Sequence, residues 1–330
     1  MKNILDIYCD HVPEELKPFL SCAQVTRLKD VGMHCGLEYT SYPFYKDFEK
    51  YSRYNHSVGV ALITYNFTHN IKETLASLFH DISTPCFAHV IDFLNGDYIK
   101  QESTEEKTNS ILSNSDEIVS NLKQLDLTVD QVSDYHLYPI ADNDTPRLSA
   151  DRLEYTLHNF ANFWHLKASK IEEFYSSLIV STNEDNEKEI SFKDEKLALE
   201  FTLLTLKNSM VYLKDENRYS MEHLARLIKD AIADNVITYD DLYTDEHSLI
   251  YKLTKDAKYL NRWLEFRNLD SIDKSDEIKD GYYLIRAKKR YIDPLVVNKG
   301  RVSSIYKEAK EKIDEFLSMS FEYYLRGYSK

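Results

Sequence analysis

His80-Asp81-Ile82-Ser83-Thr84-Pro85-Cys86-Phe87-Ala88-His89-Val90-Ile91-Asp92 is the most informative stretch of this 330-residue chain. Two further stretches are Arg53-Tyr54-Asn55-His56-Ser57-Val58-Gly59-Val60 and Ser149-Ala150-Asp151-Arg152-Leu153-Glu154-Tyr155. Apolar residues at helical spacing adjoin all three, so His56 begins one predicted helix and Asp151 opens another. His80 and Asp81 close a third. Because helix ends can meet at one point, these two imidazoles and two carboxylates form a candidate ligand set for a divalent transition metal.

The apolar pattern along the rest of the chain also favours helices, so we expect a mainly α fold with a small β element. Ser149 is the expected N-cap of a long helix, and a polar loop is expected over 181–189. The aromatic and β-branched segment 281–297 is the best strand candidate. The predicted helices cover residues 55–70, 73–82, 150–180, 193–214, 220–235, 246–268 and 301–326.

The composition excludes several classes of protein. The chain has 7 glycines, and their positions allow neither the Rossmann nor the P-loop fingerprint. Lys and Arg number 41 against 55 Asp and Glu, a formal charge of −14, so we expect no general nucleic-acid binding. The apolar fraction of 43% is enough for a sizeable core.

Cysteine usage and the apolar runs predict where the protein works. The four cysteines form no C-x-x-C pair and are expected to be reduced thiols; they are Cys9, Cys22, Cys35 and Cys86. Acidic residues interrupt the N-terminal apolar segment, which argues against a signal peptide. No apolar run approaches the length of a transmembrane helix. We therefore expect a cytoplasmic protein without a membrane partner.

The three stretches resemble the HD-domain metal-dependent phosphohydrolases, and within them the deoxynucleoside triphosphate triphosphohydrolase (dNTPase) branch. The likeness lies in R-x-x-H-S-x-G-V from Arg53, in H-D-x-x-x-x-x-F-x-H-x-x-D from His80, and in D-R-x-x-Y from Asp151. It implies a helical bundle core over 1–180, and the remaining residues, 181–330, are expected to form a mainly helical C-terminal region.

The resemblance also implies roles for individual residues. His56, His80, Asp81 and Asp151 would hold one divalent transition metal (Fe, Mn, Zn, Ni or Co, with Mg as an alternative). Arg53 would contact a substrate phosphate through its two-pronged guanidinium. The other implied roles are His89 as an acid or phosphate ligand, Asp92 as its orienting partner, and Tyr155 in the wall of the substrate pocket. Each of these residues also has an ordinary structural interpretation, as a core histidine, a surface acid or a surface ion pair.

Several positions depart from the family pattern. Ser83-Thr84 stands where relatives have Gly-His, and Glu105 aligns with a catalytic histidine, although it could equally lie in a solvated helix start. His158-Asn159 replaces an Arg-Asp pair, so Asn159 is the candidate contact for a sugar hydroxyl. His34-Cys35-Gly36 replaces a sugar-contacting Gln-Leu-Gly, which makes His34 a candidate substrate residue. Two phosphate-facing imidazoles are thus missing.

Three functions remain open from the sequence. The resemblance implies hydrolysis of a dNTP to a deoxynucleoside and triphosphate, but the departures predict weak activity on standard dNTPs and better hydrolysis of a less charged substrate. A phosphatase or phosphodiesterase acting on another phosphorylated metabolite is the alternative within enzymes. The third is a catalytically degenerate module that senses nucleotides. A homo-oligomer is compatible with all three.

A basic cluster near the C-terminus has two interpretations. Arg286, Lys288, Lys289 and Arg290 lie close together in the segment expected to be a strand. Such a cluster is usually a solvated strand face. On an acidic chain it could instead bind an anionic effector or lie at a subunit boundary.

Overall fold

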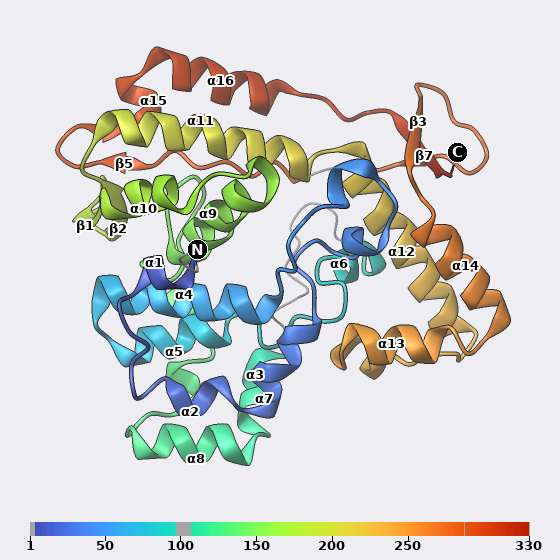
Figure 1. Cartoon of the computed structure of the whole chain (residues 1–330), viewed down its shortest axis with the longest axis horizontal. Helices are drawn as coiled ribbons and strands as arrows, with labels where there is room; N and C mark the ends of the chain where they lie inside the picture. Colours follow the sequence, from blue (N-terminus) through green and yellow to red (C-terminus); the bar gives the residue numbers. More distant parts are fainter. Residues whose placement is uncertain (1–3, 97–106, 287, 330) are drawn as a thin grey trace.

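The computed structural model describes residues 4–96, 107–286 and 288–329, and in these ranges the chain is mainly α-helical with two small sheets (Figure 1). The helices before residue 165 are α1 (Leu5–Tyr8), α2 (Lys17–Leu20), α3 (Ala23–Thr26), α4 (Arg53–Thr68), α5 (Ile71–Phe79), α6 (Val90–Leu94), α7 (Thr108–Ser113), α8 (Asp116–Gln124) and α9 (Ala150–Trp164). The later helices are α10 (Ala168–Ser176), α11 (Glu195–Tyr212), α12 (Asp215–Ala233), α13 (Glu246–Leu253), α14 (Ala257–Arg267), α15 (Val302–Ile305) and α16 (Lys307–Ser318). The predicted fold class is confirmed.

Polar caps define the helices that carry the motifs. Ser52 caps α4 by accepting a hydrogen bond from the backbone N–H of Asn55, at 3.3 Å. Ser149 caps α9 as predicted, accepting from the N–H of Arg152 at 3.3 Å. These caps satisfy backbone donors that the first helical turn leaves without partners. They therefore fix where each helix begins, and with it the position of His56 and Asp151 one turn or less inside.

Three predicted helices are interrupted. The stretch 150–180 divides into α9 and α10 because His165 takes a left-handed conformation, with φ 52°. The stretch 246–268 divides into α13 and α14 because Asp256 caps a new helix. The stretch 301–326 becomes α15 and α16 and then leaves the helix altogether. Hydrophobic spacing alone did not reveal these breaks, because it continues in register across them.

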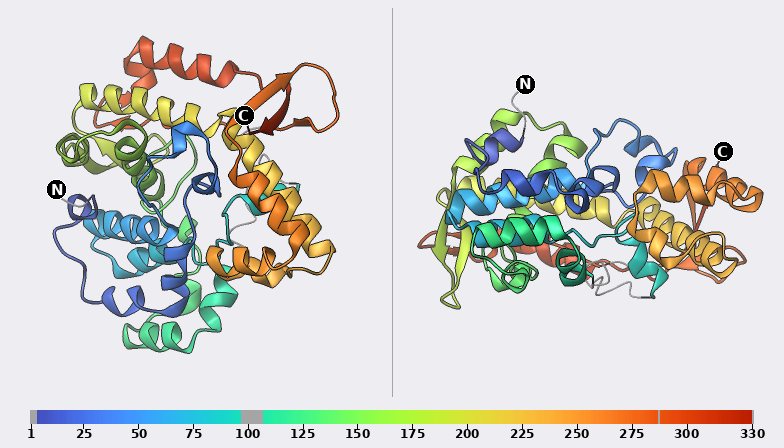
Figure 2. Two further views of the ribbon diagram at one scale, coloured as in Figure 1. Left: turned by 45° about the vertical axis from the view of Figure 1, so that its right-hand side comes forward. Right: turned by 90° about the horizontal axis from the view of Figure 1, so that it is seen from below.

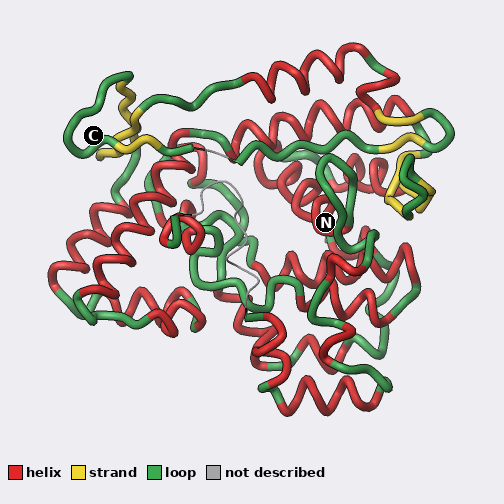
Figure 3. The backbone as a smooth tube through the Cα atoms, turned by 180° about the vertical axis from the view of Figure 1, so that it is seen from behind, coloured by secondary structure: helices red, strands yellow, loops and turns green. Residues whose placement is uncertain are grey.

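Two small sheets lie at opposite ends of the molecule (Figure 3). The four-stranded sheet has the order β1-β2-β5-β6, formed by β1 (Leu178–Thr182), β2 (Lys188–Phe192), β5 (Leu295–Val296) and β6 (Gly300–Arg301). The three-stranded sheet has the order β3-β7-β4, formed by β3 (Ser271–Ser275), β7 (Tyr324–Tyr328) and β4 (Tyr283–Leu284). β2 and β5 run parallel, and the other neighbouring strands are antiparallel.

The sheets correct two sequence predictions. The polar loop expected over 181–189 is a hairpin, in which Leu178 pairs with Phe192 and Thr182 with Lys188. The strand expected over 281–297 is wrong for most of its length. Only its two ends are strands, and they belong to different sheets, so the intervening residues cross irregularly from one sheet to the other.

Two large clusters and two small ones form the apolar core of the described residues. The first joins α1, α4, α5, α9 and α10 with β2 and the start of α11. The second joins α6, α12, α13 and α14 with residues 35–45. Figure 2 shows these two groups of helices side by side from two further directions. The division of the chain near residue 180 remains a prediction. Among the described residues, no helix combines the length and apolar character needed to cross a membrane.

Candidate metal centre and its pocket

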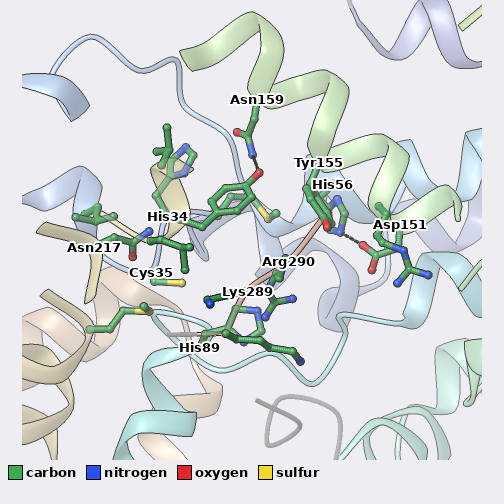
Figure 4. A pocket seen from close by; sticks show the side chains of 18 of the residues that line it. His34, Cys35, His56, His89, Asp151, Tyr155, Asn159, Asn217, Lys289 and Arg290 are labelled. Atoms are coloured by element: carbon green, nitrogen blue, oxygen red, sulfur yellow. Dashed lines mark hydrogen bonds and ion pairs between the residues drawn. The ribbon is translucent and has the colours of Figure 1, made fainter. Parts of the chain in front are cut away.

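A cavity of about 490 Å³ borders the second core cluster and contains the predicted metal ligands in its wall (Figure 4). His56 comes from the first turn of α4, His80 and Asp81 follow the end of α5, and Asp151 lies in the first turn of α9. The three helix ends therefore meet, as the sequence predicted. His56, His80 and Asp151 form a group whose ligand atoms all lie within 4.8 Å of one another.

The ligand atoms have the separations that one shared ion requires. His56 Nε2 lies 3.2 Å from His80 Nε2 and 3.0 Å from Asp151 Oδ1. Asp81 Oδ2 lies 3.5 Å from His80 Nε2 and 3.8 Å from His56 Nε2. Ligands about 2.1 Å from a common ion stand roughly 3–4 Å apart at coordination angles of about 90–140°. The residues present therefore fit a divalent transition metal.

The Nδ1 atom of each histidine already has a hydrogen-bond partner, and this contact directs Nε2 toward the ligand cluster. His80 Nδ1 lies 2.7 Å from the carbonyl oxygen of Ser77 and donates to it. His56 Nδ1 lies 2.6 Å from Glu154 Oε2. A carbonyl or carboxylate behind a histidine sets its tautomer and raises its basicity as a metal ligand. Both imidazoles are therefore prepared to bind a cation through Nε2.

Glu154 is a candidate site residue that the sequence reasoning missed. Its side chain is fully buried, and besides His56 it accepts a hydrogen bond from the hydroxyl of Tyr51. A Cβ placed on Gly59 would lie 2.6 Å from Glu154 Cγ. This close approach explains the glycine in the first motif. The D-R-x-x-Y pattern contains Glu154 at an unspecified position, and only its helical spacing from Asp151 indicated that both face the same side of α9.

Asp81 is held from both sides. Its Oδ1 accepts from the hydroxyl of Thr84 at 2.7 Å, and its Oδ2 accepts from Arg53 Nη1 at 2.8 Å. Burial would raise the pKa of Asp81, but the charge of Arg53, together with His80 and His56, outweighs burial and keeps this pKa well below its usual range. Thr84 stands where the resemblance implies a phosphate-facing histidine. It is instead fully buried and orients the carboxylate of Asp81.

The carboxylates dominate the electrostatics of the cluster. Burial would lower the pKa of His56, but hydrogen bonds to Asp151 and Glu154, with their charges, raise it to about 10. Burial would likewise raise the pKa of Asp151, but its hydrogen bond to His56 holds it below the ordinary range. The cluster therefore favours a positive charge at its centre.

This electrostatic arrangement predicts proton release on metal binding. Between pH 6 and 9 the imidazole of His56 carries a proton in the metal-free protein, because its pKa of about 10 lies above this range. Metal ligands must be deprotonated, so we expect about one proton released per ion bound and an apparent affinity about tenfold weaker for each unit of decreasing pH. Calorimetric titration with Mn²⁺ in buffers of different ionisation enthalpy measures how many protons are released per ion bound. A pH-independent affinity over this range would contradict the prediction.

Arg53 lies in the cavity wall at the first position of α4 and is 7% exposed. One prong of its guanidinium donates to Asp81, and no acceptor among the described residues reaches its Nε. A buried donor without a partner is costly. The Nε of Arg53 is thus a donor that no described residue engages, and the contact of Arg53 with a phosphate stays a prediction.

We expect Arg53→Lys to damage activity although it retains the charge. An ammonium group cannot donate to Asp81 and to a phosphate in the two-pronged geometry of a guanidinium. Loss of one charge-assisted hydrogen bond costs about 1.5–3 kcal/mol, so kcat/KM should fall about tenfold to hundredfold while metal content stays constant. Steady-state kinetics with metal analysis measures both quantities. Wild-type kinetics in this variant would place Arg53 outside the site.

His89 and Asp92 lie together as predicted. His89 Nδ1 is 2.9 Å from Asp92 Oδ2, and Asp92 is fully buried. Burial lowers the pKa of His89 below its ordinary value, although Asp92 opposes this effect. The ring therefore favours the neutral form, with Nδ1–H donating to Asp92 and Nε2 free to accept a proton. Because His89 lines the cavity, this geometry suits a base better than an acid.

The remaining predicted substrate residues also reach the cavity. Tyr155, Asn159 and His34 all line it (Figure 4). Asn159 Nδ2 donates to the hydroxyl of Tyr212 at 2.9 Å, whereas no described residue donates to its buried Oδ1. The predicted catalytic residue Glu105 lies outside the described residues.

The basic cluster lies in the wall of the cavity. Arg286, Lys288, Lys289 and Arg290 line the same cavity as the candidate metal ligands, on the segment between β4 and β5. The interpretation as a strand face is therefore wrong, whereas a role in binding an anion stays a prediction. The cluster begins about 130 residues after the last of the three motifs, and the sequence carried no sign that the C-terminal region returns to the cavity.

Comparison with known proteins supports the assignment of the fold. A phosphohydrolase from Bacteroides thetaiotaomicron superposes with a TM-score of 0.65 at 14% identity, covering 97% of both chains. The fold is that of a known phosphohydrolase. A hypothetical protein from Aquifex aeolicus gives a TM-score of 0.60 at 17% identity and covers 96% of this chain and 93% of that one.

Two curated relatives share detectable sequence similarity. The uncharacterized protein YdhJ of Bacillus subtilis is 27% identical over 257 residues, or 74% of each chain. The metal-dependent phosphohydrolase cns2 of Cordyceps militaris is 26% identical over 182 residues, which cover 52% of this chain and 49% of that protein. No protein-family model matches the chain. The relatives support the resemblance to metal-dependent phosphohydrolases without distinguishing the dNTPase branch.

Proposed function

We propose that the protein is a metal-dependent phosphohydrolase that acts on a small phosphorylated molecule, with a nucleotide as the best candidate. The observation that carries the proposal is the meeting of His56, His80 and Asp151 in a cavity wall, with each imidazole fixed from behind. The name of the Cordyceps relative agrees with this chemistry.

The proposed mechanism assigns a task to each group at this wall. A divalent ion, when bound, supplies Lewis-acid polarisation of a phosphoryl oxygen and activation of a nearby water. His56, His80, Asp81 and Asp151 would hold that ion. Arg53 would bind a phosphate oxygen and offset the negative charge that develops during hydrolysis.

His89 is the proposed general base of the reaction. Its neutral ring can accept a proton at Nε2 while Asp92 stabilises the imidazolium that results. Such a pair requires no change in ring orientation between the two protonation states, because Nδ1–H donates to Asp92 in both. Removing a general base typically lowers the rate by about 10²–10⁴-fold. His89→Asn should therefore lower kcat on that scale with the metal content unchanged, as steady-state assays and metal analysis would measure. A wild-type kcat in this variant would overturn the assignment.

The lining of the cavity away from the metal ligands favours a nucleoside as the remainder of the substrate. It contains several aromatic side chains that can pack against a base, namely Tyr45, Phe93, Phe163 and Tyr212. Asn159 offers a carbonyl oxygen that no described residue engages, which suits a sugar hydroxyl. By resemblance, the reaction would be hydrolysis of a dNTP to a deoxynucleoside and triphosphate.

Hydrolysis of a smaller phosphorylated metabolite is the second candidate. It is favoured by Thr84, because the hydroxyl that replaces a phosphate-facing histidine is directed to Asp81 and not to the cavity. A phosphatase or phosphodiesterase needs fewer contacts to a polyphosphate than a triphosphohydrolase does.

A panel of substrates assayed with Mn²⁺ tests these candidates. It should contain the four dNTPs, nucleoside mono- and diphosphates, a cyclic nucleotide and p-nitrophenyl phosphate, with products identified by chromatography. Triphosphate released from a dNTP would support the first candidate, and inorganic phosphate released from a monoester would support the second. Nucleotide binding without any hydrolysis would contradict the proposed enzyme and favour a sensing module.

A further inference from the structure

The candidate metal ligand Asp81 and the histidine His89 are joined by residues 82–88, here called the 82–88 loop. The loop lies between the end of α5 and the start of α6. Phe87 and Ala88 both take a left-handed backbone conformation, with φ 62° and 48°. In residues other than glycine this conformation is unfavourable, and it persists where surrounding contacts hold it. His89 follows the loop directly and lines the cavity (Figure 4), so its position depends on what holds the loop.

The 82–88 loop is held from outside the cavity by the chain that leads into α13. The N–H of Cys86 donates to the carbonyl oxygen of Leu242 at 2.7 Å. The N–H of Phe87 donates to Glu246 Oε1 at 3.2 Å. The second contact depends on a side chain, and it reaches the left-handed part of the loop two positions before His89.

The same carboxylate also holds a second segment of the cavity wall, residues 32–39. Glu246 Oε1 accepts from the N–H of Gly32 at 2.9 Å, and Oε2 accepts from the hydroxyl of Tyr39 at 2.7 Å. Gly32 in turn forms a β-bridge with Ser52, the N-cap of α4. One buried carboxylate therefore connects the 82–88 loop to the start of the helix that carries the first candidate metal ligand.

Glu246 is placed for this contact and not for its own helix. It is 2% exposed and does not line the cavity. The N-cap of α13 is Asp245, whose carboxylate accepts from the N–H of Ser248 at 2.8 Å. A buried carboxylate is costly unless hydrogen bonds offset its desolvation, and the donors that surround Glu246 come from two distant segments. Its burial therefore serves the connection between these segments.

We propose that Glu246 is a positioning residue of the reaction, which holds His89 at its place in the cavity wall through the 82–88 loop. This inference rests on the proposed function, because it takes His89 as the general base. A base must lie within hydrogen-bond reach of the proton that it accepts. A displacement of about 1 Å can lower a rate about 100-fold, so the hold on the loop affects the chemical step although Glu246 itself stays outside the cavity.

Three substitutions of Glu246 separate its geometry from its charge. Glu246→Ala removes both oxygens. Glu246→Gln keeps an oxygen for the N–H groups of Gly32 and Phe87, and its amide can donate to the hydroxyl of Tyr39. Glu246→Asp keeps the charge on a side chain that is one methylene shorter, and it replaces Glu246→Ala in the comparison if the alanine variant does not fold. The matched control is Asp245→Ala, which removes the cap of the same helix.

Turnover of a dNTP and of p-nitrophenyl phosphate with Mn²⁺ is the first measurement. We expect kcat to fall about tenfold to hundredfold in Glu246→Ala, with the metal content unchanged. Glu246→Gln should stay within about threefold of wild type, and so should the control. Wild-type kcat in both Glu246→Ala and Glu246→Asp would overturn the proposal, as would a loss of the same size in Asp245→Ala.

A double-variant cycle tests whether Glu246 acts through His89. In the His89→Asn background, adding Glu246→Ala should lower kcat less than about threefold, because a base that is absent cannot be displaced. If the two losses multiply instead, Glu246 acts by another route and the proposal is wrong.

Hydrogen exchange at the amide of Phe87 tests the contact without turnover. Exchange should become about tenfold to hundredfold faster in Glu246→Ala than in wild type, as expected for a lost hydrogen bond to a charged group. It should stay near the wild-type rate in Glu246→Gln and Asp245→Ala. An unchanged rate in Glu246→Ala would overturn the hold on the loop. The expected pattern of exchange in a protein that hydrolyses no substrate would support the positioning of His89 and contradict the proposed hydrolase.

Discussion

The substitution Asp151→Asn is expected to remove the metal from the protein. Purified wild type should carry about one transition metal per chain, and this variant less than about a tenth of that amount. The amide keeps the shape of the carboxylate but lacks the negative charge that balances the cation. Asp151 also accepts from His56 Nε2 at 3.0 Å, so its replacement weakens two parts of the cluster. Elemental analysis after dialysis measures the amount of metal per chain.

Asp142→Asn is the matched control for this prediction. Asp142 is another aspartate of the same cavity, but its charged partners are Arg152 at 3.1 Å and His136 at 3.6 Å, neither of which is a proposed metal ligand. Its variant should keep the metal. Thermal unfolding with excess Mn²⁺ shows whether each variant is folded, and Asp81→Asn should repeat the loss. Full occupancy in folded Asp151→Asn and Asp81→Asn proteins would remove the basis of the metal centre.

The substitution Glu154→Gln should weaken metal binding without touching a ligand. Glu154 holds His56 Nδ1 at 2.6 Å from within the core, and an amide in its place lowers the basicity of the ring. Changes in such supporting groups typically cost about 10–100-fold in metal affinity or activity. Calorimetric titration with Mn²⁺ measures the affinity, and activity at saturating Mn²⁺ should recover in part.

A suitable control for Glu154→Gln is Glu222→Gln. Glu222 is also buried, at 4% exposed, but it pairs with Arg226 and does not line the cavity. Its variant should match wild type in metal affinity, even if its stability falls. Equal metal affinity in Glu154→Gln and wild type would show that His56 does not depend on Glu154 for its role.

The candidate metal centre was the most predictable part of the molecule. His56, His80, Asp81 and Asp151 lie at helix ends, and caps such as Ser149 mark those ends in the sequence. Local patterns therefore indicated both which residues would face one another and where each helix begins. The predicted contact between His89 and Asp92 has the same origin, since residues three apart near a helix start are neighbours.

The rest of the site could not be predicted because it depends on packing between distant segments. Glu154 was recognisable only as a helical neighbour of Asp151, and its contact with Gly59 needs the crossing of α4 and α9. The position of Lys289 and Arg290 depends on two strand pairings, of β4 with β7 and of β5 with β2, that are only two residues long. Strands this short leave no alternating pattern to detect.

The substrate's charge is a separate prediction from the sequence. Thr84 and Glu105 indicated that phosphate-facing imidazoles had been lost, which predicted a substrate less charged than a dNTP. The substrate panel tests this prediction.

The most direct test of the metal centre is an anomalous difference map from crystals grown with Mn²⁺. The account predicts one strong peak about 2.1 Å from His56 Nε2, His80 Nε2 and the carboxylates of Asp81 and Asp151. Data collected on both sides of the absorption edge identify the ion. A map without a peak among these four residues, or with the ion bound by other residues of the chain, would contradict the account.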